Sequence, residues 1–328
     1  MSGAPPVEAR GLVKRYGEIV AVDHVDLTVA EGDVYGYLGP NGAGKTTSLR
    51  MLLGLIRPDG GTARLFGRDP LLEGARALDG VAGFVEAPRF YPYMSGRRNL
   101  ELVAALDGDG AAGRIDAALD TVDLADRAKD RVGGYSHGMR QRLGIAGALL
   151  RDPRLLLLDE PATGLDPAGM RDMRALIRRL ADQGMTVLLS SHLMAEVEEL
   201  CDRVAIVRDG RVVHEGSLHE LIATTAGRYD LRTTDDARAL EVARHEPGVE
   251  EVVPAERGLR FVAAGEDAAA RLSVALVEAG VGISALVPRT ASLEELFFRM
   301  TEGDAQSGDP APPPPPDAAV AGRSGSPA

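Results

Sequence analysis

The stretch Gly39–Thr46 is the feature that most constrains this chain. It reads Gly-Pro-Asn-Gly-Ala-Gly-Lys-Thr and matches the pattern G-x-x-x-x-G-K-[ST], in which glycines let the backbone wrap around phosphate groups. An apolar run, Val34–Leu38, precedes it, and a helix predicted over Lys45–Leu55 follows it. This order disfavours a glycine-rich turn that binds nothing. It predicts a phosphate loop at a helix N-terminus, where the helix dipole favours anions.

The loop residues have distinct tasks in holding phosphate groups. Lys45 is predicted to reach the β- and γ-phosphates, and the Thr46 hydroxyl to ligate Mg²⁺. The chain has only three lysines, at positions 14, 45 and 129, so a lysine at this point of the pattern is informative. The candidate nucleotide-binding residues of the loop are Gly39, Pro40, Asn41, Gly42, Ala43, Gly44, Lys45, Thr46 and Thr47.

Two carboxylates end the apolar run Leu155–Leu158 far downstream. They are Asp159 and Glu160. At the end of a buried strand Asp159 can complete the Mg²⁺ shell, and Glu160, displaced to the other side, can act as a general base toward water. A buried strand that merely ends in a capping acidic pair is disfavoured by the phosphate loop upstream. The two elements together predict phosphoryl transfer.

The pattern of apolar runs predicts the fold class. Runs such as Val34–Leu38, Leu155–Leu158 and Thr186–Ser190 are short and lack strict alternation, as strands buried on both faces do. Helical stretches, including Met170–Asp182, lie between them. Residues 7–226 are therefore predicted to form an α/β domain with a mainly parallel sheet.

The remainder of the chain follows a different pattern. Within residues 227–301 the predicted order is strand, helix, strand, strand, helix, strand and a last helix, which indicates a small split-βαβ, ferredoxin-like accessory unit. Residues 302–328 are mostly Gly, Ser, Asp, Ala and Pro, with five consecutive prolines at 312–316, so we expect a disordered tail. A partner that recognises the prolines as a polyproline helix is the alternative. Residues 1–6 are also expected to be disordered.

Composition excludes several classes of protein. The net charge of -12 and the pI near 5.1 argue against a protein that coats nucleic acid. No stretch approaches 18 consecutive apolar residues, so we expect no membrane crossing by this chain itself, and its N-terminus lacks the pattern of a secretory signal. Cys201, the single cysteine, cannot make an internal disulfide, which fits a reducing compartment. It is expected to be a buried, small hydrophobic residue.

The phosphate loop and the two carboxylates, with other motifs in a fixed order, resemble the ATP-binding subunit of an ABC transporter over about residues 7–225. Tyr16 lies where this family stacks an aromatic ring on adenine, and His192 lies where it has its switch histidine. The resemblance implies a P-loop ABC ATPase domain with a helical subdomain. It also implies ATP and Mg²⁺ as cofactors, with Glu160 and His192 as the catalytic residues.

Two further motifs resemble the parts of this family that act across a dimer. Residues 136–143 resemble the signature motif, which opens a helix, and Gly164–Pro167 resembles the D-loop. In this family two subunits close head to tail, so the resemblance implies that Asp166 couples the two sites and that signature residues face the other subunit's ATP. Those residues are Ser136, His137, Gly138 and Met139. The second subunit is either another copy or a related chain.

The sequence departs from the usual family pattern at two places. The signature reads Tyr-Ser-His-Gly-Met where Leu-Ser-Gly-Gly-Gln is usual, so the serine and the second glycine are kept. Glu86 stands where the family has a glutamine, after a strand predicted over Val81–Val85. A carboxylate there binds a cation more strongly than an amide does, which makes Glu86 a candidate Mg²⁺ ligand beside Thr46 and Asp159. Both departures resemble exporters of the bacitracin and lantibiotic resistance type.

Aromatic residues mark a candidate partner surface. Phe90–Met94 carries three aromatic side chains in a chain with 4% aromatic residues. The resemblance implies a transmembrane permease subunit as the partner, and a peripheral location on the cytoplasmic face of the cell membrane. A self-packed loop is the alternative. Phe297 and Phe298, in a helix predicted over Ser292–Met300, pack either on the other subunit or on their own sheet.

The favoured function is the ATPase subunit of an ABC exporter that moves a drug or an antimicrobial peptide. A soluble ABC ATPase of translation or DNA repair is the main alternative. It is disfavoured by the single phosphate loop, the lack of a heptad insertion and the acidic charge, and no nucleic acid is expected as a partner. A regulatory subunit that binds ATP with little turnover is the third possibility. The intact set of Lys45, Asp159, Glu160 and His192 argues against it.

Overall fold

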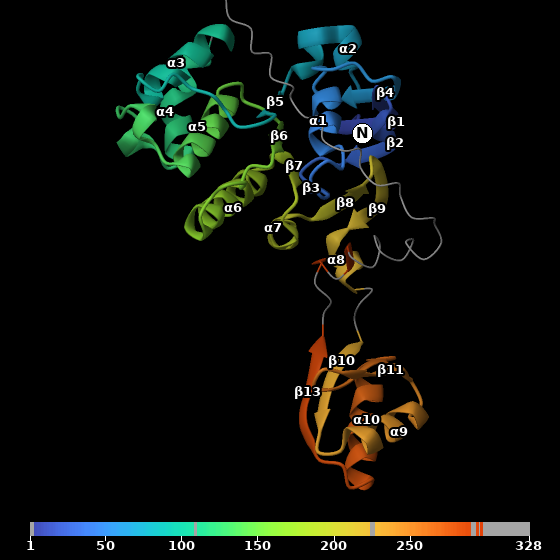
Figure 1. Cartoon of the computed structure of the whole chain (residues 1–328). Helices are drawn as coiled ribbons and strands as arrows, with labels where there is room; N and C mark the ends of the chain where they lie inside the picture. The colour runs from blue at the N-terminus through green and yellow to red at the C-terminus, as the bar shows by residue number, and fades with distance from the viewer. Residues whose placement is uncertain (1–2, 108–109, 224–226, 290–292, 295, 298–328) are drawn as a thin grey trace, which may run out of the picture.

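A six-stranded sheet in the order β5-β6-β7-β3-β8-β9 forms the centre of the N-terminal part of the molecule (Figure 1). The computed structural model describes residues 3–107, 110–223, 227–289, 293–294 and 296–297. The strands are β3 (Val34–Leu38), β5 (Val81–Phe84), β6 (Leu155–Asp159), β7 (Thr186–Ser191), β8 (Arg203–Arg208) and β9 (Arg211–Ser217). All neighbours in this sheet are parallel except β8 and β9. The prediction of an α/β domain with a mainly parallel sheet is confirmed.

Both faces of the central strands are buried. Along β3, Val34 and Leu38 belong to the hydrophobic cluster on one side of the sheet, and Tyr35 and Tyr37 to the cluster on the other side. Successive side chains of a strand point to opposite faces, so a strand covered on both sides needs apolar residues at every position. The uninterrupted apolar runs in the sequence have this physical origin.

Helices cover the two faces of the sheet. The helices of this part are α1 (Lys45–Leu52), α2 (Pro70–Glu73), α3 (Gly96–Asp107), α4 (Ile115–Thr121), α5 (His137–Leu149), α6 (Pro167–Asp182), α7 (Met194–Leu200) and α8 (Leu218–Ala223). Figure 1 shows α3, α4 and α5 grouped together on one side of the molecule, away from α1 and α2. This group corresponds to the predicted helical subdomain. Helix α1 is shorter than predicted, because Gly54 follows with a φ of 68°.

A second, antiparallel sheet has the strand order β2-β1-β4. It consists of β1 (Val7–Tyr16), β2 (Ile19–Val29) and β4 (Gly60–Leu65). Its buried side chains share one hydrophobic cluster with α1 and with one face of the central sheet. Carbonyl Ala21 O of β2 lies so near the phosphate loop that a Cβ added at Gly44 would be 2.2 Å away. This sheet therefore supports the loop from one side.

Residues 228–289 form a four-stranded antiparallel sheet with two helices and their own hydrophobic cluster. The elements are β10 (Arg228–Thr233), α9 (Asp236–His245), β11 (Val249–Ala255), β12 (Gly258–Ala263), α10 (Glu266–Glu278) and β13 (Ile283–Arg289), and the strand order is β11-β12-β10-β13. Among the described helices, here and in the N-terminal part, none combines the length and the apolar composition needed to cross a membrane.

Two expected boundaries need correction. Residues 1–6 were expected to be disordered, yet Pro6 is buried and its carbonyl accepts a hydrogen bond from the Phe66 backbone N–H at 3.2 Å. Residues 227–301 were expected to form one unit, yet Leu293, Leu296 and Phe297 are buried in the cluster that lies under α6, α7 and α8. The helix expected over Ser292–Met300 lies partly, and the tail 302–328 entirely, outside the described residues.

Candidate functional site

The parallel strands bring the predicted site residues to one edge of the sheet. The phosphate loop follows β3, Glu86 lies shortly after β5, and Asp159 is the last residue of β6. His192 follows β7 directly. The strand order β5-β6-β7-β3 makes these four strands neighbours, so their carboxyl ends meet. Open α/β sheets bind ligands at this edge.

The phosphate loop depends on glycine at two positions where φ is positive. Gly42 has a φ of 84° and Gly44, the residue before α1, has a φ of 97°. A Cβ on Gly42 would meet no heavy atom within 4 Å, so the loop leaves open space on that side. A left-handed conformation next to a helix N-terminus turns successive backbone N–H groups toward a common point. The geometry is that of a phosphate cradle.

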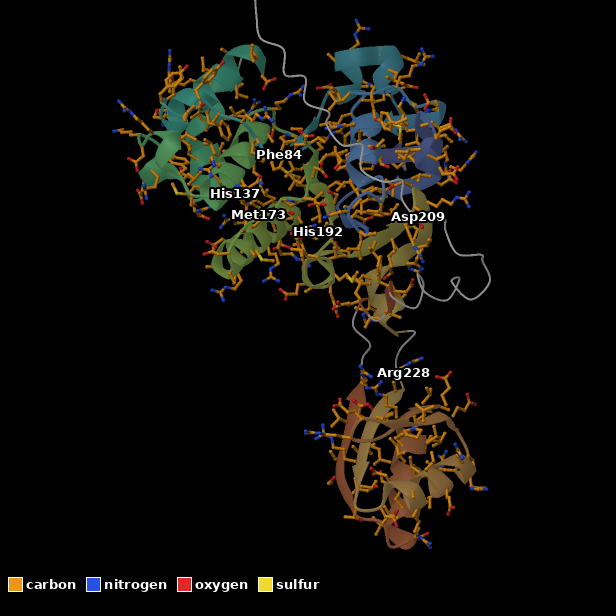
Figure 2. The ribbon with its side chains drawn as sticks, in the orientation of Figure 1. Phe84, His137, Met173, His192, Asp209 and Arg228 are labelled. Carbon is orange, nitrogen blue, oxygen red and sulfur yellow. The ribbon has the colours of Figure 1, made fainter. Side chains whose placement is uncertain are left out.

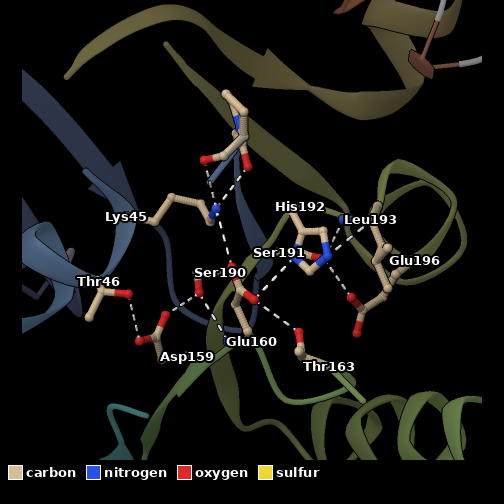
Figure 3. Close-up of polar contacts among 12 residues, drawn as sticks. Lys45, Thr46, Asp159, Glu160, Thr163, Ser190, Ser191, His192, Leu193 and Glu196 are labelled. Carbon is tan, nitrogen blue, oxygen red and sulfur yellow. Dashed lines mark hydrogen bonds and ion pairs between the residues drawn. The ribbon is translucent and has the colours of Figure 1, made fainter. Parts of the chain in front are cut away.

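Lys45 is buried inside this loop, with 4% of its surface exposed. Its ammonium donates hydrogen bonds to the carbonyl oxygens of Gly39 (2.8 Å) and Pro40 (3.1 Å). It also forms an ion pair with Glu160, with Nζ 3.2 Å from Oε1 (Figure 3). A buried charge must be paired and hydrogen bonded, and Lys45 meets both requirements.

The Asp159 carboxylate accepts hydrogen bonds from groups on three sides of the site. Its Oδ2 accepts from the Thr46 hydroxyl at 2.9 Å and from the Glu86 backbone N–H at 3.4 Å. Its Oδ1 accepts from the Ser190 hydroxyl at 2.5 Å. Thr46 and Asp159 are thus within direct hydrogen-bond distance although 113 residues separate them. Hydroxyl and carboxylate oxygens are the ligands that Mg²⁺ prefers, so this pair fits a magnesium ion.

Glu160 connects the two ends of the site (Figure 3). Its Oε2 accepts from the Thr163 hydroxyl at 2.9 Å and lies 3.1 Å from Nδ1 of His192, while Oε1 faces Lys45. Its backbone has a φ of 48°, a left-handed conformation that is unusual for glutamate. Its backbone N–H donates to the Ser190 hydroxyl at 3.0 Å, which stabilises the turn. The turn displaces Glu160 from Asp159, as expected from the sequence.

The environment of Glu160 keeps its carboxyl ionised. Partial burial alone would raise the pKa of Glu160. The hydrogen bond from Thr163 and the positive charge of Lys45 outweigh that effect, so the pKa lies below its ordinary value. An ionised carboxylate with a free approach to water is what a general base requires.

The Glu86 side chain points away from Asp159. It forms an ion pair with Arg50 of α1 and is half exposed, and only its backbone N–H reaches the Asp159 carboxylate. Its φ of 69° is again left-handed. Glu86 still lines the hollow shared by Thr46, Asp159 and Glu160. The structure thus shows a competing partner for a carboxylate that the sequence offered as a metal ligand.

Two of the signature residues, Ser136 and Gly138, lie at a hollow that no phosphate-loop residue lines. Ser136 caps α5, since its hydroxyl accepts from the Met139 backbone N–H at 3.2 Å. Ser136 and Gly138 line a separate hollow together with Asp166. His137 borders both hollows and contacts the carbonyl of Thr163 at 3.0 Å. Figure 2 shows His137 on α5 beside Met173 of α6.

Asp166 and Tyr16 occupy the edges of the site. The Asp166 carboxylate accepts from the Gly169 backbone N–H at 2.9 Å and caps α6. The ring of Tyr16 is 48% exposed at the hairpin between β1 and β2, and Lys14 lies 5.6 Å from its centroid. β2 also carries Ala21, whose carbonyl borders the phosphate loop. The half-exposed side chain of Tyr16 is available for stacking.

Four polar residues in the site were missed by sequence reasoning. Thr163 and Ser190 orient the two carboxylates, and Arg50 pairs with Glu86. Gln141 is 3% exposed, borders the hollow around Asp159, and its Oε1 has no hydrogen-bond partner in the described part of the chain. Thr163 has a local signal, because it follows Glu160 by three residues at the start of a loop. Ser190, Arg50 and Gln141 lie far along the sequence from the site residues that they contact or border.

The fold and the site define a P-loop ATPase of the ABC class, and comparison with known proteins agrees. The family model described as "ABC transporter" matches residues 22–163. The chain is 36% identical over 298 residues to the bacitracin transport ATP-binding protein BcrA of Bacillus licheniformis, covering 90% of this chain and 97% of the relative. It is 38% identical over 302 residues to the daunorubicin resistance ATP-binding protein DrrA3 of Streptomyces coeruleorubidus, covering 90% and 95%.

Solved structures show the same similarity. A dimeric ATP-binding cassette, MJ0796, in a post-hydrolysis state with ADP and phosphate, superposes with a TM-score of 0.58 at 25% identity. The match covers 65% of this chain and 98% of that one. The chain belongs to the ABC transporter family, as an ATP-binding protein. The resemblance seen in the sequence is confirmed.

Proposed function

We propose that this chain is the ATP-hydrolysing subunit of an ABC exporter and drives a separate transmembrane permease. The observation that carries the proposal is the meeting of Lys45, Thr46, Asp159, Glu160 and His192 at one edge of a parallel sheet. The reaction is ATP + H₂O to ADP + phosphate. Phosphoryl transfer needs positioning and charge neutralisation, and this set of side chains provides both.

The chain's own groups divide the work of binding ATP. Backbone N–H groups of residues 41–47 and the Lys45 ammonium hold the phosphates, and the Tyr16 ring stacks on adenine. Thr46 and Asp159 hold Mg²⁺, with Glu86 at the border of the same hollow. When bound, Mg²⁺ neutralises charge on the phosphate oxygens.

Glu160 acts as the general base. Its ionised carboxylate orients a water molecule and takes its proton during attack on the γ-phosphate. His192 holds the carboxylate in place through Nδ1 and Oε2, and Thr163 fixes the same oxygen from the other side. Lys45 faces the second oxygen, which ties the base to the phosphate loop.

A second subunit completes the site. Ser136 and Gly138 line a hollow distinct from that of Thr46 and Asp159, which supports a role at another chain's nucleotide rather than at their own. The N-terminus of α5 offers backbone N–H groups and a positive dipole end to the γ-phosphate there. His137 and Met139 flank that contact, and Asp166 couples the two sites. The dimeric neighbour in the comparison supports this arrangement.

The permease binds at the surface that follows Glu86. Arg89, Phe90, Tyr91 and Leu106 line a groove beside α3, and Tyr91 is 52% exposed. Tyr93, 63% exposed, lies 5.8 Å from Tyr91 between ring centroids. Exposed aromatic side chains at a groove suit an amphipathic helix of a partner. The subunit would thus sit on the cytoplasmic face of the membrane.

The exported substrate is a drug or an antimicrobial peptide. This part of the proposal rests on relatives named for bacitracin transport and daunorubicin resistance that match this chain over 90% of its length. Those relatives are ATP-binding subunits of transport and resistance systems, so a translation or DNA repair factor is not favoured. Residues 227–289 form an accessory unit whose element order and strand order, β11-β12-β10-β13, fit a ferredoxin-like fold.

The decisive experiment purifies the tagged chain from detergent-solubilised membranes of its own cells. A permease that co-purifies in fixed proportion, with an ATPase rate that Glu160→Gln lowers by about 10²-fold or more, is the expected result. ATP binding must survive in Glu160→Gln, because Lys45 and Thr46 are untouched. Recovery of the chain with ribosomes, or without any membrane protein, would overturn the transport function. Equal rates in the wild type and Glu160→Gln would overturn the ATPase.

A further inference from the structure

The end of the described chain returns to the ATPase body behind the switch histidine. Leu293, Leu296 and Phe297 are 0%, 5% and 8% exposed, and they belong to the large hydrophobic cluster on one side of the central sheet, which includes residues of α7 and α8, rather than to the cluster of residues 228–289. Figure 1 shows the described part of this segment, in red, beside α8. We call Leu293, Leu296 and Phe297 the C-terminal anchor.

The anchor contacts the helix that follows His192. The Leu293 backbone N–H donates to Oε2 of Glu198 on α7 at 3.4 Å. Val197 and Leu200, the buried side chains on the inner face of α7, lie in the same cluster as the anchor. The anchor therefore packs at the helix whose first residue comes two positions after His192.

Helix α7 needs such support because it is short and its start lacks a side-chain cap. It has seven residues, and its N-cap is Leu193. Ser191 compensates in part, since its hydroxyl accepts from the Leu193 backbone N–H at 3.0 Å and donates to Glu196 at 2.6 Å (Figure 3). Glu196 is buried, and its Oε1 has no partner in the described part of the chain. A seven-residue helix holds its position by packing rather than by propensity.

The accessory unit is inserted between two attachments to this region. The chain leaves the ATPase body after α8, forms β10 to β13, and returns at the anchor. Leu218 and Leu221 of α8 lie in the same cluster as the anchor. The unit is thus joined along the chain to two elements of this cluster, α8 and the anchor.

We propose that the C-terminal anchor is a positioning element for His192, through which the accessory unit controls the hydrolysis step. It acts on α7, α7 sets the position of the His192 ring, and the ring holds the Glu160 carboxylate at 3.1 Å. The phosphate loop meets this region through the Lys45–Glu160 pair and through the Gly39 backbone N–H, which donates to the Ser191 carbonyl at 3.2 Å. Both contacts involve residues that come before α7 in the chain, so loosening the anchor should slow hydrolysis and leave Lys45 and Thr46 able to bind ATP. This inference rests on the proposed ATPase function.

The test uses the full-length chain with the substitutions Leu296→Ala and Phe297→Ala together. The expected result is a kcat lower by about five-fold with unchanged ATP affinity, together with a changed ring NMR signal of His192, assigned through His192→Ala. The single variant Phe297→Leu, which keeps a large apolar side chain at this position, should have the wild-type kcat. Leu72→Ala is the matched control, because Leu72 is 84% exposed on α2 and its loss should change neither quantity.

Two outcomes would overturn the proposal. One is a folded double variant with the wild-type kcat and an unchanged His192 signal. Another is a parallel loss of kcat and ATP affinity that follows the loss of folded protein. If the double variant does not fold, Glu198→Ala replaces it, because this substitution removes the acceptor of the Leu293 N–H. The kcat and the His192 signal of Glu198→Ala then test the proposal. A wild type no faster than Glu160→Gln would instead overturn the ATPase function, and the His192 signal would still test the anchor.

Discussion

At the scale of one residue, the neighbours of Glu160 determine the pKa of its carboxyl. Burial disfavours its charge, yet Thr163 and Lys45 hold its pKa below the ordinary value. The base is therefore ionised throughout the neutral range, and activity is lost on acidification only as the pH falls toward that lowered pKa. His192 adds a third contact without changing the sign of this balance.

Removing the Thr163 hydroxyl should shift this pH dependence. Thr163→Val deletes the hydrogen bond to Oε2, which stabilises the charged form, so the pKa of Glu160 rises. The acid limb of the kcat profile then moves to higher pH. Steady-state ATPase rates across the acid range measure it. Thr121→Val is the control, because Thr121 donates within α4 to the Ala117 carbonyl, and an equal shift in both variants would contradict the assignment.

Glu86 gives a second prediction at the residue scale. Glu86→Gln removes the ion pair with Arg50 but keeps the backbone N–H that reaches Asp159, so hydrolysis should persist while transport coupling changes. Stability should fall by no more than about 1 kcal/mol, because the pair is half exposed. Urea unfolding and transport in membrane vesicles measure the two quantities. If the ion pair is needed for transport coupling, Arg50→Gln should have the same effect as Glu86→Gln. Wild-type transport in both variants would show that coupling does not depend on the pair.

At the scale of the element, the phosphate loop depends on backbone conformation more than on side chains. Gly44→Ala places a Cβ 2.2 Å from the Ala21 carbonyl and forces an alanine to a φ of 97°. The expected cost is about 1–3 kcal/mol of stability, with loss of nucleotide binding. Thermal unfolding measures the loss of stability, and binding of a fluorescent ATP analogue measures the loss of nucleotide binding. Gly113→Ala, where an added Cβ meets nothing within 4 Å, should be neutral, and similar losses in both variants would contradict the cradle.

Elements with strong local signals were predicted well. The strands Val34–Leu38 and Leu155–Asp159 are buried on both faces, and their unbroken apolar runs show this directly. The antiparallel sheet β2-β1-β4 was not predicted, although β1 and β2, with 10 and 11 residues, are the longest of the described strands. Its pairing joins Val7 to Leu65, a distance along the sequence that local patterns do not encode. Strand pairing over such distances depends on packing against α1.

At the scale of the whole molecule, two defective subunits should complement each other. Lys45→Ala lacks the phosphate contact, and Ser136→Arg blocks the signature serine, so each alone should be inactive. In an equal mixture, half of the dimers carry one complete site, and the ATPase rate should recover to about a quarter of the wild-type value. Rate measurements on the separate and mixed proteins test it. Ser136→Arg that retains full activity alone would show that the signature does not act across the dimer.

The sequence by itself determined the class of fold, the phosphate loop and the order of the catalytic motifs. These features are local, because a glycine conformation, an apolar strand and a capping serine are each defined by a few adjacent residues. The tertiary structure decided which groups meet: Ser190 with Asp159, Arg50 with Glu86, and the C-terminal anchor with α7. Those contacts join residues 31, 36 and 95 positions apart. Contacts over such separations arise only when elements pack, and no local pattern specifies them.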